Sequence, residues 1–96
     1  MLQAIYLKKL KDEVNSFFNQ EKEVKVFIFG SSLTQDHFGD IDIGLIGTKS
    51  SYTAIQLKEK ITSTNFPYFV DVIDFNSVSA EFKNNIFNNE ILWIRP

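Results

Sequence analysis

The run of six residues from Val24 to Phe29 is the feature that most constrains how this chain folds. Successive side chains of a strand point to opposite faces of a sheet, so valine, isoleucine and phenylalanine here make both faces apolar. Such a run is typical of a strand that is covered on both sides. We therefore predict a central strand that ends at Gly30, the first residue after the run.

The rest of the chain predicts helices and strands around this strand, with no repeat or linker between them. The predicted helices are residues 2–20, a segment that opens at Ser50 or Ser51 and ends at Asn65–Pro67, and a last helix through Val78, Phe82 and Ile86. The other predicted strands are residues 40–46, 68–75 and 91–94. A short turn over residues 31–38 is capped by Ser31 or Ser32 and closed by Gly39 in a left-handed conformation. This order predicts a single α+β (α/β-like) domain over residues 1–96, with one mixed sheet and helices packed on it.

Composition excludes several classes of protein. The 96 residues contain no cysteine, which rules out a disulfide framework and a thiolate metal site. The net charge is −2 and Arg95 is the only arginine, so we expect no general nucleic-acid binding, which is usually driven by basic residues. No apolar stretch is long enough to span a membrane and no signal pattern begins the chain, so a cytoplasmic location is expected.

Paired acidic residues begin the predicted strand at 40–46. Asp40 and Asp42 are two residues apart, so their side chains project from one face, while Ile41 and Ile43 face the core. Two adjacent carboxylates repel each other unless a cation lies between them, and Mg²⁺ prefers such oxygen ligands. The pair alone is a weak signal, and by itself it favours two solvated acids at the edge of a strand.

Two further features favour a ligand site. Gly30 allows close approach to the backbone, and Ser31 offers a hydroxyl and an N–H group at the start of a turn, where phosphate can bind. Asp71 lies in the middle of an apolar strand, where an unpaired carboxylate is costly, and it is therefore the candidate for a third metal ligand. Asp74 is an odd number of residues away and is predicted to cap the following turn.

The chain resembles the DNA polymerase β nucleotidyltransferase superfamily in the order of its elements. This order is a strand, Gly30–Ser31, a turn, Asp40–Ile41–Asp42, a helix and an apolar strand with Asp71. The small size and the tail FKNNIFNNEILWI are similar to its minimal nucleotidyltransferase branch, which includes antitoxin partners of HEPN-domain toxins. The resemblance implies that Gly30 and Ser31 bind nucleotide phosphates, and we include Ser32. It implies that Asp40, Asp42 and Asp71 hold two Mg²⁺ ions, which Mn²⁺ can replace. It also implies that Asp71 helps to deprotonate the attacking hydroxyl.

The expected function is Mg²⁺-dependent transfer of AMP from ATP, or of another nucleotide from its triphosphate, to an acceptor hydroxyl. The resemblance suggests a tyrosine of a HEPN-domain partner as the acceptor, within a homo- or hetero-oligomer. Many minimal members have basic residues after the glycine–serine pair, where this chain has Leu33, Thr34 and Gln35. Two alternatives therefore stay open: an inactive module that restrains a protein partner, and a nucleotide sensor. His37 and Lys58 are interpreted as solvent-exposed residues without a functional role.

Overall fold

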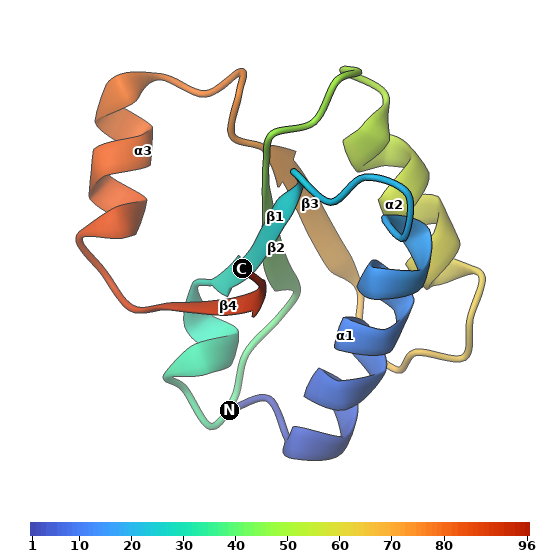
Figure 1. The fold of residues 1–96 in the computed structure, drawn as a ribbon. Coiled ribbons are helices and arrows are strands. Elements are labelled where there is room, and N and C mark those ends of the chain that lie inside the picture. Colours follow the sequence, from blue (N-terminus) through green and yellow to red (C-terminus); the bar gives the residue numbers. More distant parts are fainter.

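A computed structural model describes all 96 residues of the chain (Figure 1). The elements follow in the order α1 (Ala4–Phe17), β1 (Lys25–Phe29), the 3₁₀ turn η1 (Ser31–Leu33), β2 (Ile41–Ile46), α2 (Thr53–Thr62), β3 (Val70–Asp74), α3 (Ala80–Phe87) and β4 (Ile91–Arg95). The four strands form one sheet in the order β3–β2–β1–β4. β1 is antiparallel to β2 and β4, while β2 and β3 are parallel. The predicted α+β class with a mixed sheet is confirmed.

The central position of β1 is confirmed too, since β1 has a neighbour on each side. One face of the sheet is covered by α1 and α2, which lie together on the right in Figure 1. The main core is formed there by apolar residues from both helices and all four strands: Leu10, Val14, Phe18, Val24, Val26, Ile28, Ile41, Ile43, Leu45, Ala54, Leu57, Ile61, Val70 and Ile94. None of the three helices has the length and apolar character that crossing a membrane would require.

The opposite face carries a smaller aromatic core beneath α3. Phe27, Phe29 and Phe75 are buried there, and Phe82 and Phe87 of α3 pack against them. Phe27 lies directly over Gly44, its register partner on β2. A Cβ atom on Gly44 would come within 2.3 Å of the Phe27 ring, so the glycine makes room for this side chain. α3 covers only part of this face, and the beginnings of β2 and β3 lie outside the aromatic core.

The single arginine has a structural role. Arg95 donates hydrogen bonds to the carbonyl oxygens of Phe18, Glu21 and Val24, at 2.9, 3.1 and 3.0 Å. It also donates to Asn15 Oδ1 at 2.8 Å. The planar guanidinium thereby ties the last strand to the connection between α1 and β1, and it is not available to a distant ligand.

The helices are shorter than predicted. α1 begins at Ala4, because the N–H of Leu2 donates to the carbonyl of Ser32 across the loop and does not enter the helix. α2 begins only at Thr53, since Ser50 forms the preceding turn by accepting a hydrogen bond from the N–H of Tyr52. The last helix begins after Ser79, whose hydroxyl accepts from the N–H of Phe82. Val78 therefore precedes the helix, although it packs on the same aromatic core.

Both predictions about the turn after β1 are wrong. Gly30, which has no side chain, precedes the 3₁₀ turn, and neither Ser31 nor Ser32 caps it with a hydroxyl. The Ser32 hydroxyl is instead buried without a hydrogen-bond partner. Gly39 does not have a positive φ angle, which among the glycines is found only at Gly30 and Gly47. The left-handed residue therefore stands at the beginning of the loop.

The third strand is also shorter than predicted, at Val70–Asp74, because Tyr68 turns away to pack edge-on against Tyr6. The predicted capping role of Asp74 is confirmed. Its carboxylate accepts hydrogen bonds from the N–H of Asn76 and the hydroxyl of Thr48, both at 2.9 Å.

Candidate metal and nucleotide site

The sheet brings Asp42 and Asp71 side by side. The parallel register of β2 and β3 pairs these two residues directly, so both side chains lie on the same face of the sheet. This is the face away from α1 and α2, because Ile41, Ile43 and Val70 between them are buried in the main core. The strand register and the burial of these apolar residues thus agree with the alternation expected from the sequence. Asp40 lies one residue before β2, exposed, at the same end of the sheet.

Gly30 lies against the carboxylate of Asp42. The last residue of β1, Phe29, is the register partner of Asp42, which places the following glycine beside it. Gly30 has φ 87° and ψ −162°, a region that is essentially reserved for glycine. A Cβ atom at this position would lie 2.5 Å from Asp42 Oδ2. The glycine is required both by the backbone conformation and by the nearby carboxylate.

The turn after Gly30 offers backbone donors. The N–H groups of Ser31 and Ser32 do not take part in the backbone hydrogen bonds of the loops, whereas those of Leu33, Thr34 and Gln35 do. The free donors are therefore next to the acidic residues. Ser32 is buried as a whole residue, at 1% exposure, so Ser31 is the more accessible of the two.

The acidic residues repel one another. Burial raises the pKa of Asp42 above its ordinary value, and the negative charges of Asp71 and Asp40 raise it further. Lys58 of α2 compensates in part, since its Nζ lies 3.6 Å from Asp71 Oδ1. It reaches Asp71 from the far face of the sheet, around the free edge of β3. Lys58 was interpreted from the sequence as a residue without a role, and this contact corrects that interpretation.

These residues suit a magnesium ion in their chemistry. Mg²⁺ is usually held by one or two carboxylates and keeps water and substrate phosphates as its other ligands. Asp42 and Asp71 supply such an oxygen-only pair. No three acidic or histidine side chains lie close enough together to hold an ion in this conformation. Repulsion among the carboxylates and the contact of Asp71 with Lys58 both keep the acids apart. His37 is exposed and belongs to no such group.

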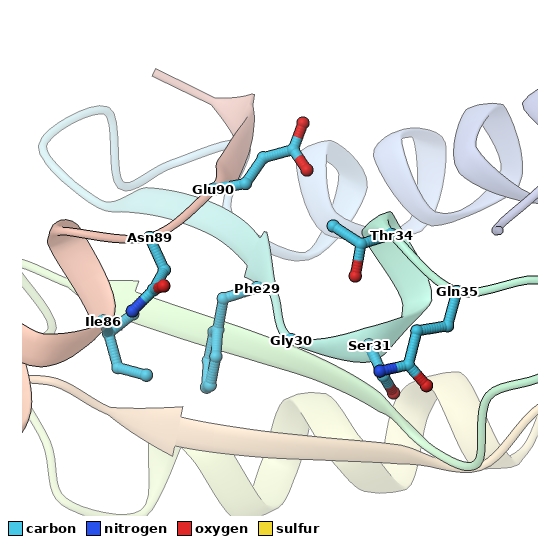
Figure 2. A pocket seen from close by; sticks show the side chains of 8 residues that line it. All are labelled: Phe29, Gly30, Ser31, Thr34, Gln35, Ile86, Asn89 and Glu90. Atoms are coloured by element: carbon cyan, nitrogen blue, oxygen red, sulfur yellow. The ribbon is translucent and has the colours of Figure 1, made fainter.

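A cleft of about 320 Å³ adjoins the glycine–serine turn. Figure 2 shows Ser31, Thr34 and Gln35 on one side of it, Ile86 and Asn89 from the end of α3 on the other, and Phe29 and Gly30 between them. Glu90 is the only charged residue of this lining. The cleft therefore lacks a cation for phosphate, as the Leu33–Thr34–Gln35 segment indicated.

One residue next to the acids was missed from the sequence. Phe69 directly precedes β3, and its carbonyl accepts a hydrogen bond from the N–H of Ile41 at 3.0 Å. Its side chain is 76% exposed, the highest value among the large apolar residues that lie on the surface. The signal in the sequence was its spacing of two residues from Asp71, which places both on one face.

The mixed sheet and the acidic face agree with the family that the chain matches. Residues 12–95 match the family described as Polymerase beta, Nucleotidyltransferase, and the chain belongs to this family. None of the curated proteins matches the chain.

Solved structures agree with this assignment of the fold. A mutant of the toxin–antitoxin MntA–HpeT superimposes with a TM-score of 0.66 and 17% sequence identity, over 88% of this chain and 70% of that one. A toxin–antitoxin with AMP-PNP gives 0.63 and 20%, over 88% and 71%. The toxin–antitoxin MntA–HepT gives 0.61 and 16%, over 91% and 70%. The resemblance stated from the sequence, to the DNA polymerase β nucleotidyltransferase superfamily, is confirmed by the family match, and these structures share its fold.

Proposed function

We propose that this chain is a Mg²⁺-dependent nucleotidyltransferase that moves AMP from ATP to an acceptor hydroxyl. The observation that carries the proposal is the direct register of Asp42 and Asp71, beside a glycine whose Cα lies against the Asp42 carboxylate. Asp40, Asp42 and Asp71 are the residues that would hold the metal. When bound, Mg²⁺ would neutralise the carboxylates and the phosphate charge that develops during transfer.

The residues around the acids have separate roles in this proposal. The N–H group of Ser31, followed in the turn by that of the buried Ser32, holds the phosphate tail, and Gly30 allows its close approach. Asp71 takes the proton of the acceptor hydroxyl. The oxygen of that hydroxyl forms a bond to the α-phosphorus, the bond to the bridging oxygen of the β-phosphate breaks, and pyrophosphate leaves with the electron pair.

The proposed acceptor is a tyrosine of a HEPN-domain protein, with which the chain would form an antitoxin-type pair. The toxin–antitoxin structures of the same fold support a toxin as the partner, and the tyrosine is proposed from the resemblance stated for the sequence. Transfer to such a partner would explain how a domain of this size acts on a large substrate. The partner would orient its own hydroxyl at the site, and orientation supplies much of the rate.

The test uses ATP labelled at the α-phosphate, Mg²⁺ and the chain co-expressed with a HEPN-domain protein, to be sought among the genes next to its own. We expect label on the partner with the wild type and loss of at least 100-fold in rate with Asp42→Ala, because charge stabilisation at the reacting phosphate is removed. Asp36→Ala is the matched control, since Asp36 is an exposed acid of the same loop. Equal rates in the two variants would exclude Asp42 from catalysis.

A second function, restraint of a partner by binding alone, is favoured by one observation. The cleft beside Gly30 and Ser31 has no lysine, arginine or histidine in its lining. If the wild type transfers no label, and partner binding survives in both Asp40→Ala and Asp42→Ala, the binding module is the correct function.

A further inference from the structure

The order of the strands separates two sides of the proposed site. The N–H group of Ser31 follows β1, Asp42 belongs to β2 with Asp40 just before it, and Asp71 lies on β3. These strands are neighbours in the order β1–β2–β3, each about 4.8 Å from the next. The phosphate tail of the nucleotide is thus on the β1 side, and Asp71 is at the opposite edge.

In-line displacement then decides from which side the acceptor comes. The attacking and leaving oxygens lie on opposite sides of the phosphorus that is transferred. Because pyrophosphate leaves toward the turn after β1, the attacking hydroxyl must approach over β3. β3 is an edge strand, so no further strand covers this approach, and the Lys58 side chain that reaches Asp71 around the edge is itself half exposed.

Phe69 stands at this edge. It continues β3 by one residue, as the hydrogen bond of its carbonyl to the N–H of Ile41 shows, and the register places it opposite Asp40. Val70 is buried in the main core, so the side chains of Phe69 and Asp71, one residue to either side, project from the other face. Phe69 has no aromatic partner, although its neighbours Phe66 and Tyr68 pack against each other. Phe69 is 76% exposed beside the proposed general base, so its ring contributes little buried apolar surface to the stability of the fold.

On the basis of the proposed function, we infer that Phe69 is a specificity-determining residue that contacts the acceptor and selects an aromatic hydroxyl. The ring of a tyrosine packs against Phe69 in an offset or edge-to-face manner, and this contact holds the phenol oxygen between Asp71 and the α-phosphorus. A serine or threonine hydroxyl has no ring to make this contact. The residue thus links an exposed apolar surface to the choice of substrate.

The experiment compares two small acceptors, N-acetyltyrosinamide and N-acetylserinamide, with the full chain, Mg²⁺ and labelled ATP. We expect transfer to the tyrosine compound to be preferred. Phe69→Ala should lower kcat/KM for that compound by about tenfold, in line with the loss of one aromatic contact, and leave KM for ATP unchanged. Phe69→Trp should restore most of the rate. Tyr52→Ala is the control, because Tyr52 is also an exposed aromatic residue, at 67%, but follows the other end of β2.

A binding measurement keeps the inference testable without turnover. In ¹⁵N-labelled chain with Mg²⁺ and a non-hydrolysable ATP analogue, N-acetyltyrosinamide should shift the amide signals of Phe69 and Asp71 more than that of Tyr52. Shifts without transfer to either the small acceptor or the co-expressed partner would overturn the proposed function and leave the acceptor site standing. Transfer that depends on Asp42 but is unchanged by Phe69→Ala would overturn the inference alone. A rise in KM for ATP in Phe69→Ala would also overturn it, because the ring would then contact the nucleotide.

Discussion

Replacing Gly30 by alanine perturbs the fold and the proposed site together, and the two effects can be separated. At φ 87° and ψ −162°, any residue with a Cβ atom is strained by about 1–3 kcal/mol. The new methyl group would also stand 2.5 Å from Asp42 Oδ2. The carboxylate can rotate away, at about 0.5–1.5 kcal/mol if it leaves a preferred rotamer. Gly30→Ala should therefore destabilise the chain by about 1.5–4.5 kcal/mol in total.

Thermal unfolding of four proteins tests this reasoning: the wild type, Gly30→Ala, Asp42→Ala and the double variant. A change of 1 kcal/mol moves the melting temperature of a domain of this size by about 4–8 °C. In the Asp42→Ala background the carboxylate is gone but the backbone strain remains, so Gly30→Ala should still cost about 1–3 kcal/mol. The difference between the two backgrounds measures the close contact with Asp42.

Gly39→Ala is the matched control for this cycle. Gly39 has no positive φ angle, and a Cβ atom there would meet nothing within 4 Å. The substitution should leave stability unchanged or raise it by about 0.4–1 kcal/mol, since alanine restricts the unfolded chain. If Gly30→Ala and Gly39→Ala melt at the same temperature, the turn does not hold Gly30 in the left-handed conformation. If Asp42→Ala fully restores the stability of Gly30→Ala, the contact with the carboxylate is the whole cause and the backbone strain is absent.

Three further substitutions test the charges of the molecule. Because the folded state raises the pKa of Asp42, its ionised form is disfavoured, and stability is lost as the pH rises from the ordinary aspartate pKa through the raised one. Asp42→Asn should therefore be more stable than the wild type at pH 7 without metal, by less than about 1 kcal/mol after solvent screening. In thermal unfolding this difference should disappear toward pH 3, and Mg²⁺ should stabilise the wild type more than the variant. Lys58→Met should cost less than about 0.5 kcal/mol, because the pair with Asp71 is half exposed, yet should tighten Mg²⁺ binding a few-fold in calorimetry; weaker binding would mean that Lys58 does not compete with the ion. Arg95→Lys should lower stability by about 1–3 kcal/mol in a denaturant titration, because an ammonium group cannot reproduce the planar set of four hydrogen bonds, and an unchanged midpoint would refute this structural role.

The alternation of side chains carried the sequence-based prediction furthest. It predicted β1 as a central strand and placed Asp42 opposite the core, and both follow from residues within one strand. The direct pairing of Asp42 with Asp71 could not be predicted in this way. Register depends on contacts between residues that are 29 positions apart in the chain, as Asp42 and Asp71 are, and no local pattern encodes it.

The same limit explains what was missed around the site. Lys58 belongs to the polar surface of α2 by its periodicity, and only the position of β3 at the sheet edge lets it reach Asp71. Gly39 and Gly30 are equally able to adopt a positive φ angle, and the contact of Gly30 with the neighbouring strand decides between them. Phe69 is a large apolar residue of the kind usually found in a core. Its neighbour Val70 is the one buried against the helices, which leaves Phe69 on the exposed face.

The charges of the open face explain how a site without basic residues in its turn could still bind a triphosphate. Asp40, Asp42 and Asp71 face one lysine, so the surface repels phosphate unless a divalent ion is bound first or arrives with the nucleotide. Many minimal members of the family have basic residues after the glycine–serine pair, and here the metal would have to supply that attraction. Nucleotide binding should consequently depend on Mg²⁺ more completely in this chain than in relatives with such residues. A module that only restrains a partner through apolar contacts has no reason to respond to the ion, so the coupling between nucleotide and Mg²⁺ distinguishes the two functions at the level of binding, before any transfer is measured.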